Sequence, residues 1–490
     1  MMATSRRNRA VHSLILAGAL LLASTADGQP ASGRTCELEF LPLRDSTSSV
    51  LERQMSGKYN AFQGGGVRYS CKGQDVTMDA DSAAYYGDLS ILYLVGQVHY
   101  RDEDATLDAD RLTYYQNEEW VIAEGNVLAN MKSGSTMRGP SAEYFRALPG
   151  VRPTERLIAT GRPTFSLRQP DSAGVARPAT GVIADRVTAE GDSLVYAGGA
   201  VEITRPDLTA NADSAMLDEG REYGQLLRNA RVLGRGEQGF TLTGLTIDLY
   251  SSAKQLERVV SLGDAQVQSD DITVTSDTLD LRVTGGKLTR AFAWGPGRAH
   301  ATAPGRDMRA DSLDVRLVDS KLRELYAVGE ARLESVPDTT NIRSNERDWL
   351  VGDTVIASFD TVAVDDSTTS PPLREVRALG AARSFQQIPP DSGITEKPSL
   401  HYVSGKTITI AFDSGQVRQV MVTSPDSGQT VGLYLDATGQ TAPPDEPGEQ
   451  PRQTPSVTVP PSLPATTPVR TPPPGAPVRQ PPSRPEQFHE

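Results

Sequence analysis

Aspartates are the residues of this 490-residue sequence whose spacing is regular enough to suggest chemistry. Seven of them directly follow a small residue in copies of one repeated pattern: Asp81, Asp110, Asp185, Asp213, Asp277, Asp311 and Asp353. Such a ladder of carboxylates could bind calcium, or it could accept hydrogen bonds from backbone N–H groups at bends of the chain. Because the sequence lacks the Gly-Gly-x-Gly-x-Asp repeat of calcium-binding β-rolls, we predict structural corner residues and no metal site.

Other residue types that serve catalysis are few and scattered. His99, His300 and His401 fit no metal-ligand spacing. The acidic run 102–104 has no aromatic sugar platform beside it, which favours a solvated turn over a pair of glycosidase carboxylates. No glycine-rich phosphate loop or serine nucleophile elbow stands out. We therefore predict no enzyme activity and no cofactor, with an enzyme acting on envelope polysaccharide as the least favoured alternative.

The sequence holds two cysteines, Cys36 and Cys71, which are 35 positions apart. In an exported chain such a pair favours a disulfide, and two unpaired thiols are the alternative. A disulfide here would staple the N-terminal segment to the first repeat.

Both ends of the chain differ in composition from its middle. Residues 1–26 combine Arg6, Arg7 and Arg9 with a ten-residue apolar stretch and then small residues, the pattern of a cleaved secretory signal peptide. Ten apolar residues are too few to span a bilayer, which takes about 20, and an uncleaved anchor is the alternative. Residues 441–490 hold 16 of the 34 prolines, which predicts an extended, disordered tail that solubilises the chain or binds a partner. We expect a soluble protein of the periplasm.

The charge balance argues against one class of partner. The chain has 49 basic and 62 acidic side chains, and its net charge is −13. Nucleic-acid binders need clusters of Lys and Arg for the phosphates, so we expect no nucleic acid. Aromatic residues make up only 6% of the sequence, which is lean for one large globular core.

The middle of the sequence, between residues 60 and 415, repeats a pattern of apolar and small residues at offsets 0, 2, 5 and 7. Its first small residue stands at positions 80, 109, 139, 184, 212, 244, 276, 310, 352 and 405. Residues two apart on a strand share a face, so the step of three would turn the second half of a plain strand inside out. A β-bulge or a sharp corner restores the inward face, and a small residue there lets the backbone turn.

A second motif, Gly-x-Val or a close variant, follows most copies, as at 96–98 and 125–127. We therefore predict that each repeat forms two strands, each with one corner. We expect an all-β fold, an elongated β-jelly roll or two-strand-per-rung β-solenoid of about ten repeats, with a three-sided right-handed β-helix as the alternative. An N-terminal segment, 27–59, leads into the regular repeats at 60–335, and 336–440 is a looser continuation with loop inserts.

Two stretches of the repeat, TMDADSAAYY…LYLVGQV and TLDADRLTYY…VIAEGNV, closely resemble the OstA/LptA-like superfamily. These are the periplasmic β-jelly rolls of lipopolysaccharide transport, also called the organic solvent tolerance-like N-terminal domain. The matching residues are Ala80-Asp81, Tyr85-Tyr86 and Gly96-Gln97-Val98, then Ala109-Asp110, Tyr114-Tyr115 and Gly125-Asn126-Val127. The resemblance is strongest over 60–145 and persists to about 335. This chain differs from the soluble bridge protein of that family by its extra rungs and its proline-rich tail.

The resemblance implies a periplasmic protein of outer-membrane biogenesis that holds the acyl chains of lipid A. It also implies partners, which are other jelly rolls at the inner and outer membranes or head-to-tail copies of this chain. The alternation of inward and outward side chains along each strand identifies those that would line the groove. They are Tyr85, Leu92, Leu94, Val98, Tyr100, Leu107, Leu112, Tyr114, Val121, Val127 and Tyr144. The same side chains could instead fill a closed core, and the chain would then be a structural or adhesive envelope β-solenoid without a lipid ligand.

Overall fold

The computed structural model describes residues 36–435, with gaps at 45–46, 149, 169–178, 236–238, 254, 270–271, 320, 338–341, 343, 361–371, 389–397, 414–415 and 424–430. Within these residues all the regular elements are β-strands, so the predicted all-β class is confirmed for this part of the chain. The predicted signal peptide, 1–26, and the predicted proline-rich tail, 441–490, lie outside the described residues.

The strands belong to one continuous sheet. They are β1 (Leu38–Pro42), β2 (Ser48–Arg53), β3 (Tyr59–Cys71), β4 (Thr77–Tyr86), β5 (Ile91–Arg101), β6 (Ala105–Tyr115), β7 (Trp120–Met131), β8 (Thr136–Phe145), β9 (Arg156–Thr160), β10 (Thr164–Leu167), β11 (Thr180–Ile183), β12 (Arg186–Glu190), β13 (Leu194–Thr204), β14 (Leu208–Asp218), β15 (Tyr223–Gly234), β16 (Phe240–Ser252), β17 (Gln255–Ser269), β18 (Ile272–Thr284), β19 (Lys287–Ala303), β20 (Arg306–Val318), β21 (Lys321–Ser335), β22 (Asp348–Phe359), β23 (Leu373–Ile388), β24 (Ser399–Asp413), β25 (Gln416–Thr423) and β26 (Val431–Leu435).

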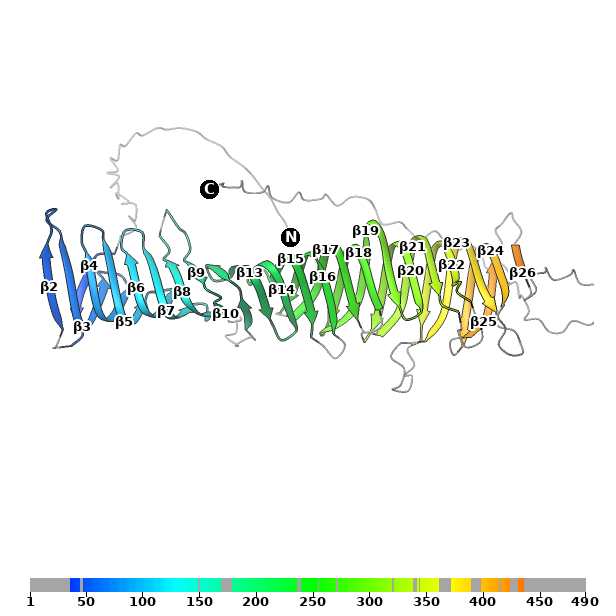
Figure 1. The fold of residues 1–490 in the computed structure, drawn as a ribbon, viewed down its shortest axis with the longest axis horizontal. Coiled ribbons are helices and arrows are strands. Elements are labelled where there is room, and N and C mark those ends of the chain that lie inside the picture. The colour runs from blue at the N-terminus through cyan, green and yellow to red at the C-terminus, as the bar shows by residue number, and fades with distance from the viewer. Residues whose placement is uncertain are drawn as a thin grey trace, which may run out of the picture.

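The sheet is a long antiparallel ladder in sequence order. From β3 to β8, and again from β13 to β25, each strand pairs with the next strand of the sequence. Between these parts, six strands close a small ring of pairings in the order β8–β9–β12–β13–β11–β10 and back to β8. Figure 1 shows the ladder as a rod whose strands run across its long axis, with β2 at one end and β26 at the other.

The long strands are bent near their middle by β-bulges. Between β4 and β5 the register passes from Asp79↔His99 to Ser82↔Val95, so β5 carries one extra residue there. The ten predicted small residues all lie at such interruptions, or, for Ala184, between the short strands β11 and β12. Alternate residues are buried on both sides of each bulge, so both halves of a strand face one core.

The Gly-x-Val motif supplies the extra residue of the bulge. In β5 both Gly96 and Gln97 have positive φ angles, +82° and +43°, in the left-handed region that glycine enters without strain. The same pair of left-handed residues recurs in β15 as Arg228 and Asn229, which carry no glycine and were not predicted as a corner. The bulge therefore keeps the same backbone geometry in β15, where the Gly-x-Val motif is absent.

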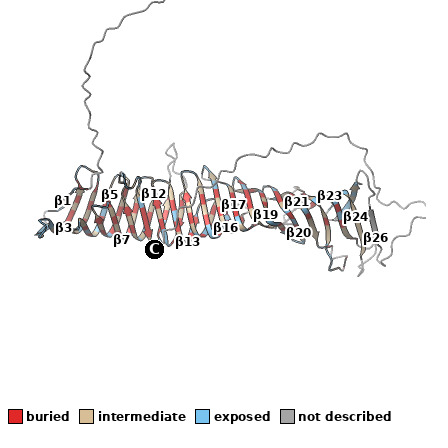
Figure 2. Ribbon diagram, turned by 90° about the horizontal axis from the view of Figure 1, so that it is seen from above, coloured by how far each residue is buried: buried red, intermediate tan, exposed pale blue. Residues whose placement is uncertain are grey.

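One hydrophobic core runs through the rod, as the buried residues along the strands in Figure 2 show. Its most deeply buried tyrosines, Tyr100, Tyr114 and Tyr144, lie in β5, β6 and β8. Leucines such as Leu242 and Leu313 are buried as completely in the later strands. The core is therefore continuous along the rod, with these bulky phenols near its N-terminal end.

The turns between strands form two rims. We call rim A the turns that follow β3, β5, β7, β10, β13 and β15, and rim B the turns that follow β4, β6, β8, β12, β14 and β16. Backbone hydrogen bonds link successive turns along each rim, from Lys132 N–H to Asp104 O on rim A and from Gln116 N–H to Ser90 O on rim B. Since the long strands are bent at their bulges, the two rims approach each other along a seam opposite the bulges.

The predicted segment boundaries fall inside the continuous ladder. Within 27–59, strands β1 and β2 pair side by side with the two halves of β3. Across the predicted boundary at 335, β21 pairs with β22 without a break, and the ladder continues to β26. The division into regular repeats and a looser continuation stays a description of the sequence.

Candidate functional site

The predicted groove-lining side chains lie together inside the rod. Ten of them are buried, and Tyr85 is half-buried. Most are exposed by 1% or less, among them Leu94, Leu112 and Tyr144. In this structure they pack against one another in a filled interior, and their contact with a lipid stays a prediction.

The predicted corner aspartates lie on the outer surface at the bulges. All but Asp213 cover a positive-φ glycine of the neighbouring strand, so that a Cβ at Gly96 or Gly125 would overlap the carboxylate of Asp81 or Asp110. One of the seven aspartates, Asp277, accepts a hydrogen bond from a backbone N–H, that of Gly297, at 2.5 Å. Asp110 instead accepts one from the side chain of Asn126 at 2.8 Å.

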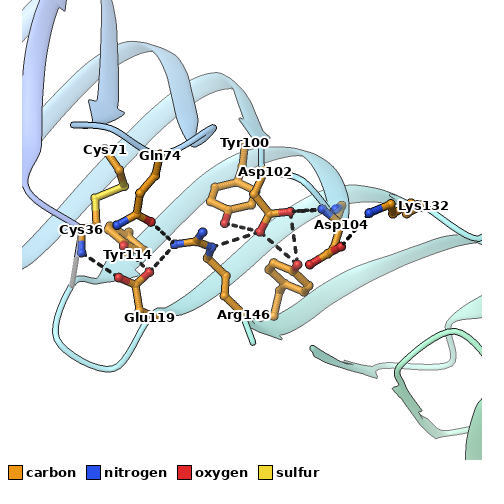
Figure 3. A network of polar contacts seen from close by, with 12 residues as sticks. Cys36, Cys71, Gln74, Tyr100, Asp102, Asp104, Tyr114, Glu119, Lys132 and Arg146 are labelled. Atoms are coloured by element: carbon orange, nitrogen blue, oxygen red, sulfur yellow. Dashed lines mark hydrogen bonds and ion pairs between the residues drawn. A yellow bond between two sulfur atoms is a disulfide. The ribbon is translucent and has the colours of Figure 1, made fainter. Parts of the chain in front are cut away.

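A buried ionic network closes the seam over the N-terminal third of the rod (Figure 3). Arg146, on rim B, donates to Asp102 on rim A at 3.2 Å and to Glu119 on rim B at 2.6 Å. The side chains of Asp102 and Glu119 are 3% and 2% exposed. The same guanidinium donates to Gln74 of rim A at 3.2 Å. Arg146 therefore holds both rims together.

Three core tyrosines complete this network with their hydroxyl groups. Tyr100 and Tyr144 donate to Asp102 at 2.8 and 3.0 Å, and Tyr114 donates to Glu119 at 2.8 Å. Burial raises the pKa of all three phenols well above the usual value, and the nearby carboxylates raise them further. Burial alone would lower the pKa of Arg146, but Tyr100, Glu119 and Asp102 raise it. The phenols stay protonated donors, and Arg146 stays charged.

The N-terminal segment forms a second connection across the seam. Cys36 and Cys71 form a disulfide, which ties the segment to the end of β3 on rim A. The backbone N–H of Cys36 donates to Glu119 at 2.8 Å, and its carbonyl oxygen accepts a hydrogen bond from Gln116, both on rim B. Cys36 therefore links rim A to rim B. The disulfide expected from the two cysteines is present.

Beyond the ionic network the seam opens into two neighbouring slots. The first slot lies between the turns around 131–136 and 165–168 of rim A and those around 189–195 of rim B. Its lining includes the buried side chains of Phe165, Leu167 and Val195. It is open to solvent, and its cavity is small, about 20 Å³, which is roughly the space of one water molecule.

The second slot shares Glu219 with the first and lies further along the seam. Ile203, Leu208, Leu217 and Leu249 line it, and its cavity is also about 20 Å³. At its far side the rims meet again, because Arg205 donates to Ser251 at 2.9 Å and Asp207 accepts from the backbone N–H of Leu256 at 2.8 Å. These bonds define the end of the open stretch of seam.

The two sides of the slots carry unequal charge. Rim A contributes Arg168 and Arg205, whereas rim B contributes Asp192, Asp218, Glu219 and Glu222. Between the ionic network and the first slot, burial raises the pKa of Glu155, and Asp104, Asp192 and Asp102 raise it further. An apolar floor with polar edges is the arrangement that accepts an amphiphile: an acyl chain below and a headgroup at the rims.

The sequence predicted the interior but not the seam. Arg146 and Glu119 belong to turns that have no repeated motif, whereas the slot residues Leu217 and Leu249 stand at the last apolar position of the repeat. The acidic run 102–104 was predicted as a solvated turn, yet the structure places Asp102 in the buried network. Its correct interpretation needed the position of Arg146, which is 44 residues away.

Two further features bear on function. No group of three or more His, Cys, Asp or Glu side chains is placed to hold a metal ion in the part of the chain that the structure describes. The same residues contain no helix that is long and apolar enough to cross a membrane. Comparison with known proteins finds no protein-family model and no curated protein that matches this chain.

Proposed function

We propose that this chain is a non-enzymatic periplasmic carrier that binds the acyl chains of lipopolysaccharide or a related glycolipid and passes it toward the outer membrane. On this proposal the ladder is an elongated β-jelly roll of the OstA/LptA-like type. The observation that carries the proposal is the open stretch of seam, where two slots with apolar floors give access to a core that runs along the rod.

The slots suit the two ends of such a lipid. Burying a methylene contributes about 0.8 kcal/mol, so a 12-carbon chain laid into the core would gain roughly 9 kcal/mol. Arg168 favours phosphates at rim A, where Arg205 is already paired with Asp207 at 2.7 Å, while the carboxylates of rim B repel them. The headgroup would therefore lie toward rim A, with the acyl chains directed inward.

The N-terminal end of the rod supports the proposed partners. Among the described strands β1 and β2 pair with β3 alone, so the outer edges of both are open to strand addition. Val50, Leu51 and Met55 are exposed there. A neighbouring jelly roll, from a membrane partner or a second copy of this chain, could extend the ladder at this edge.

Native mass spectrometry of the full chain from its native host, with lipid extraction alongside, tests the carrier. Co-purified lipid A-type species are expected. The Leu217→Asp variant, which places a charge in the second slot, is expected to lose them, and so is Gly224→Val, whose Cβ would meet Leu217 and Leu249. Leu233→Asp, on the exposed outer face of β15, is the matched control and should keep the lipid.

Two results would contradict the carrier. One is an apo mass that added lipopolysaccharide does not change. The other is equal lipid retention by the slot variants and the control, with circular dichroism confirming that each variant has folded.

The second candidate function is a structural or adhesive envelope solenoid. It is favoured by the N-terminal third of the rod, where the interior is filled by Tyr100, Tyr114 and Tyr144 and the seam is closed by Arg146. An apo mass under all conditions would favour this function.

A further inference from the structure

An aromatic stripe covers the outer face of the first rungs. It consists of Phe62, Tyr86, Tyr93, Tyr115, Trp120 and Phe145, one from each of the strands β3–β8. Their sequence neighbours, such as Tyr85, Tyr114 and Tyr144, point into the core, which places the stripe on the outside. It takes no part in the seam or the slots.

The rings of the stripe contact each other across the strands. Tyr115 stacks on Trp120 with ring centroids 4.5 Å apart, and Trp120 stacks on Phe145 at 5.4 Å with an interplanar angle of 4°. Tyr86 packs edge-on against Phe62 and Tyr93 at 5.9 and 5.7 Å. Tyr93 is 39% exposed, and the others are partly exposed. Flat, rigid aromatic surfaces of this kind are what proline-rich segments bind.

The chain carries such a segment itself. Residues 451–485 contain 13 prolines and four arginines, Arg452, Arg470, Arg479 and Arg484, and no acidic residue. Proline fixes the backbone φ angle near −65°, so this composition favours the polyproline II conformation and loses little entropy on binding. Its charge is +4.

The charge of the roll beneath the stripe is opposite. Residues 59–145, which span β3–β8, contain 13 acidic and 6 basic side chains, a net charge of −7.

A second aromatic group lies nearer the C-terminal end, where Trp349 packs against Phe385 and Tyr402 at 6.0 Å each. The guanidinium of Arg332 lies over the Trp349 ring at 5.2 Å, as that of Arg152 lies over Phe145 at the end of the stripe, so it is the acidic surface that favours the stripe.

The segment is long enough to reach the stripe from its own end of the rod. Fifteen strand-to-strand steps separate β7 from β24 along the ladder. At about 4.8 Å per step this is roughly 70 Å. At about 3.1 Å per residue, polyproline II covers that distance in roughly 23 residues. Residues 436–458 would therefore span the distance, and residues 459–485 could lie on the stripe.

We propose that the basic proline-rich segment docks on the aromatic stripe of its own roll through residues 459–485. Proline rings would pack on Tyr93 and Tyr115 and on the edge of Trp120, whose two faces are covered by Tyr115 and Phe145. Arg470, Arg479 and Arg484 would lie over the acidic surface. The tail would then shield the largest outer aromatic surface of the N-terminal rungs. This inference is independent of the lipid-carrier function.

Tryptophan quenching in the full chain tests the contact. The Thr471→Cys variant has one thiol outside the disulfide, and a bimane fluorophore attached to it is quenched when it touches tryptophan. We expect strong quenching that does not change on dilution. Trp120→Phe, which keeps an aromatic ring in the stack, should raise the emission several-fold, whereas the control Trp349→Phe should leave it quenched.

A charge variant checks the electrostatic part of the argument. Reversal of three arginines, Arg470→Glu, Arg479→Glu and Arg484→Glu, should release the fluorophore as fully as Trp120→Phe does. The proposal is overturned by an unquenched fluorophore in the parent chain, by quenching that Trp349→Phe removes and Trp120→Phe does not, or by quenching that disappears on dilution.

Discussion

Replacing Arg146 by methionine tests whether the ionic network holds the seam closed. Within the part of the chain that the structure describes, Arg146 is the only cation paired with Asp102 and Glu119, whose side chains are 3% and 2% exposed. Methionine keeps most of the buried volume but leaves two buried carboxylates without a cation. Removing one partner of a buried ion pair costs about 3–5 kcal/mol. The Tyr100 and Tyr114 hydroxyl groups stay in place, which favours the lower end of that range.

Hydrogen exchange measured by mass spectrometry is the suitable assay, because a ladder of this length opens locally rather than in one step. A loss of 3–4 kcal/mol in the opening free energy raises the exchange of β6–β8 amides about 100- to 1,000-fold. The control is Arg68→Met, because Arg68 pairs with Asp79 at a surface where the side chains are 42% and 24% exposed. That pair contributes about 0–1 kcal/mol.

A charge-matched variant separates the ion pairs from the packing of the Arg146 side chain. In the triple variant Arg146→Met, Asp102→Asn, Glu119→Gln no buried charge is left unpaired, so most of the protection should return. Exchange in Arg146→Met that equals the Arg68→Met control would refute the reasoning. So would a triple variant that exchanges as fast as the single one.

Three further predictions follow from the same structure. Replacing both Cys36 and Cys71 by serine removes a cross-link over 35 residues, and the loss should be about 4 kcal/mol of local stability, seen as faster exchange in β1 and β3. Gly125→Ala should cost about 2–4 kcal/mol because φ is +77° and the new Cβ meets Asp110, whereas Gly57→Ala, at φ +86° with open space around it, should cost only about 1 kcal/mol; equal losses in thermal melts would contradict this. The pKa of Glu155 is raised in the folded chain by burial and by neighbouring carboxylates, so the unfolded chain loses its proton first as the pH rises. Local stability should therefore fall from the ordinary carboxyl pKa up to the raised one, and Glu155→Gln should flatten that fall in exchange measured from pH 4 to pH 7.

The fold was predictable because each strand repeats the same local conflict. A step of three between inward positions contradicts the two-residue period of a strand, and only a bulge resolves it. Residues such as Ala80 and Gly96 therefore mark both the bulge and the strand on either side of it. At Arg228–Asn229 the same backbone turn is made without glycine, and the pattern gives no signal there. A motif search detects side chains, whereas the ladder requires only the backbone geometry.

The candidate site was less predictable because it depends on contacts between turns. Inward-facing residues such as Leu94 follow from parity within one strand. Asp102 and Arg146 meet only because two bent strands bring rim A and rim B together. The acidic run around Asp102 is typical of a solvated turn, and no local feature distinguishes it from one that is buried.

The two parts of the seam change where a lipid should be sought. The residues predicted as groove lining, such as Leu94 and Leu112, lie under the closed part of the seam, where three tyrosines fill the interior. A lipid there would have to displace buried phenols that already satisfy Asp102 and Glu119. In the slots the floor is apolar, no buried charge has to be uncovered, and the seam is already open to solvent on each side of Glu219. Substitutions at Leu217 should therefore reduce lipid binding without opening the ionic network, whereas a charge at Leu112 would destabilise the closed core whether or not lipid binds.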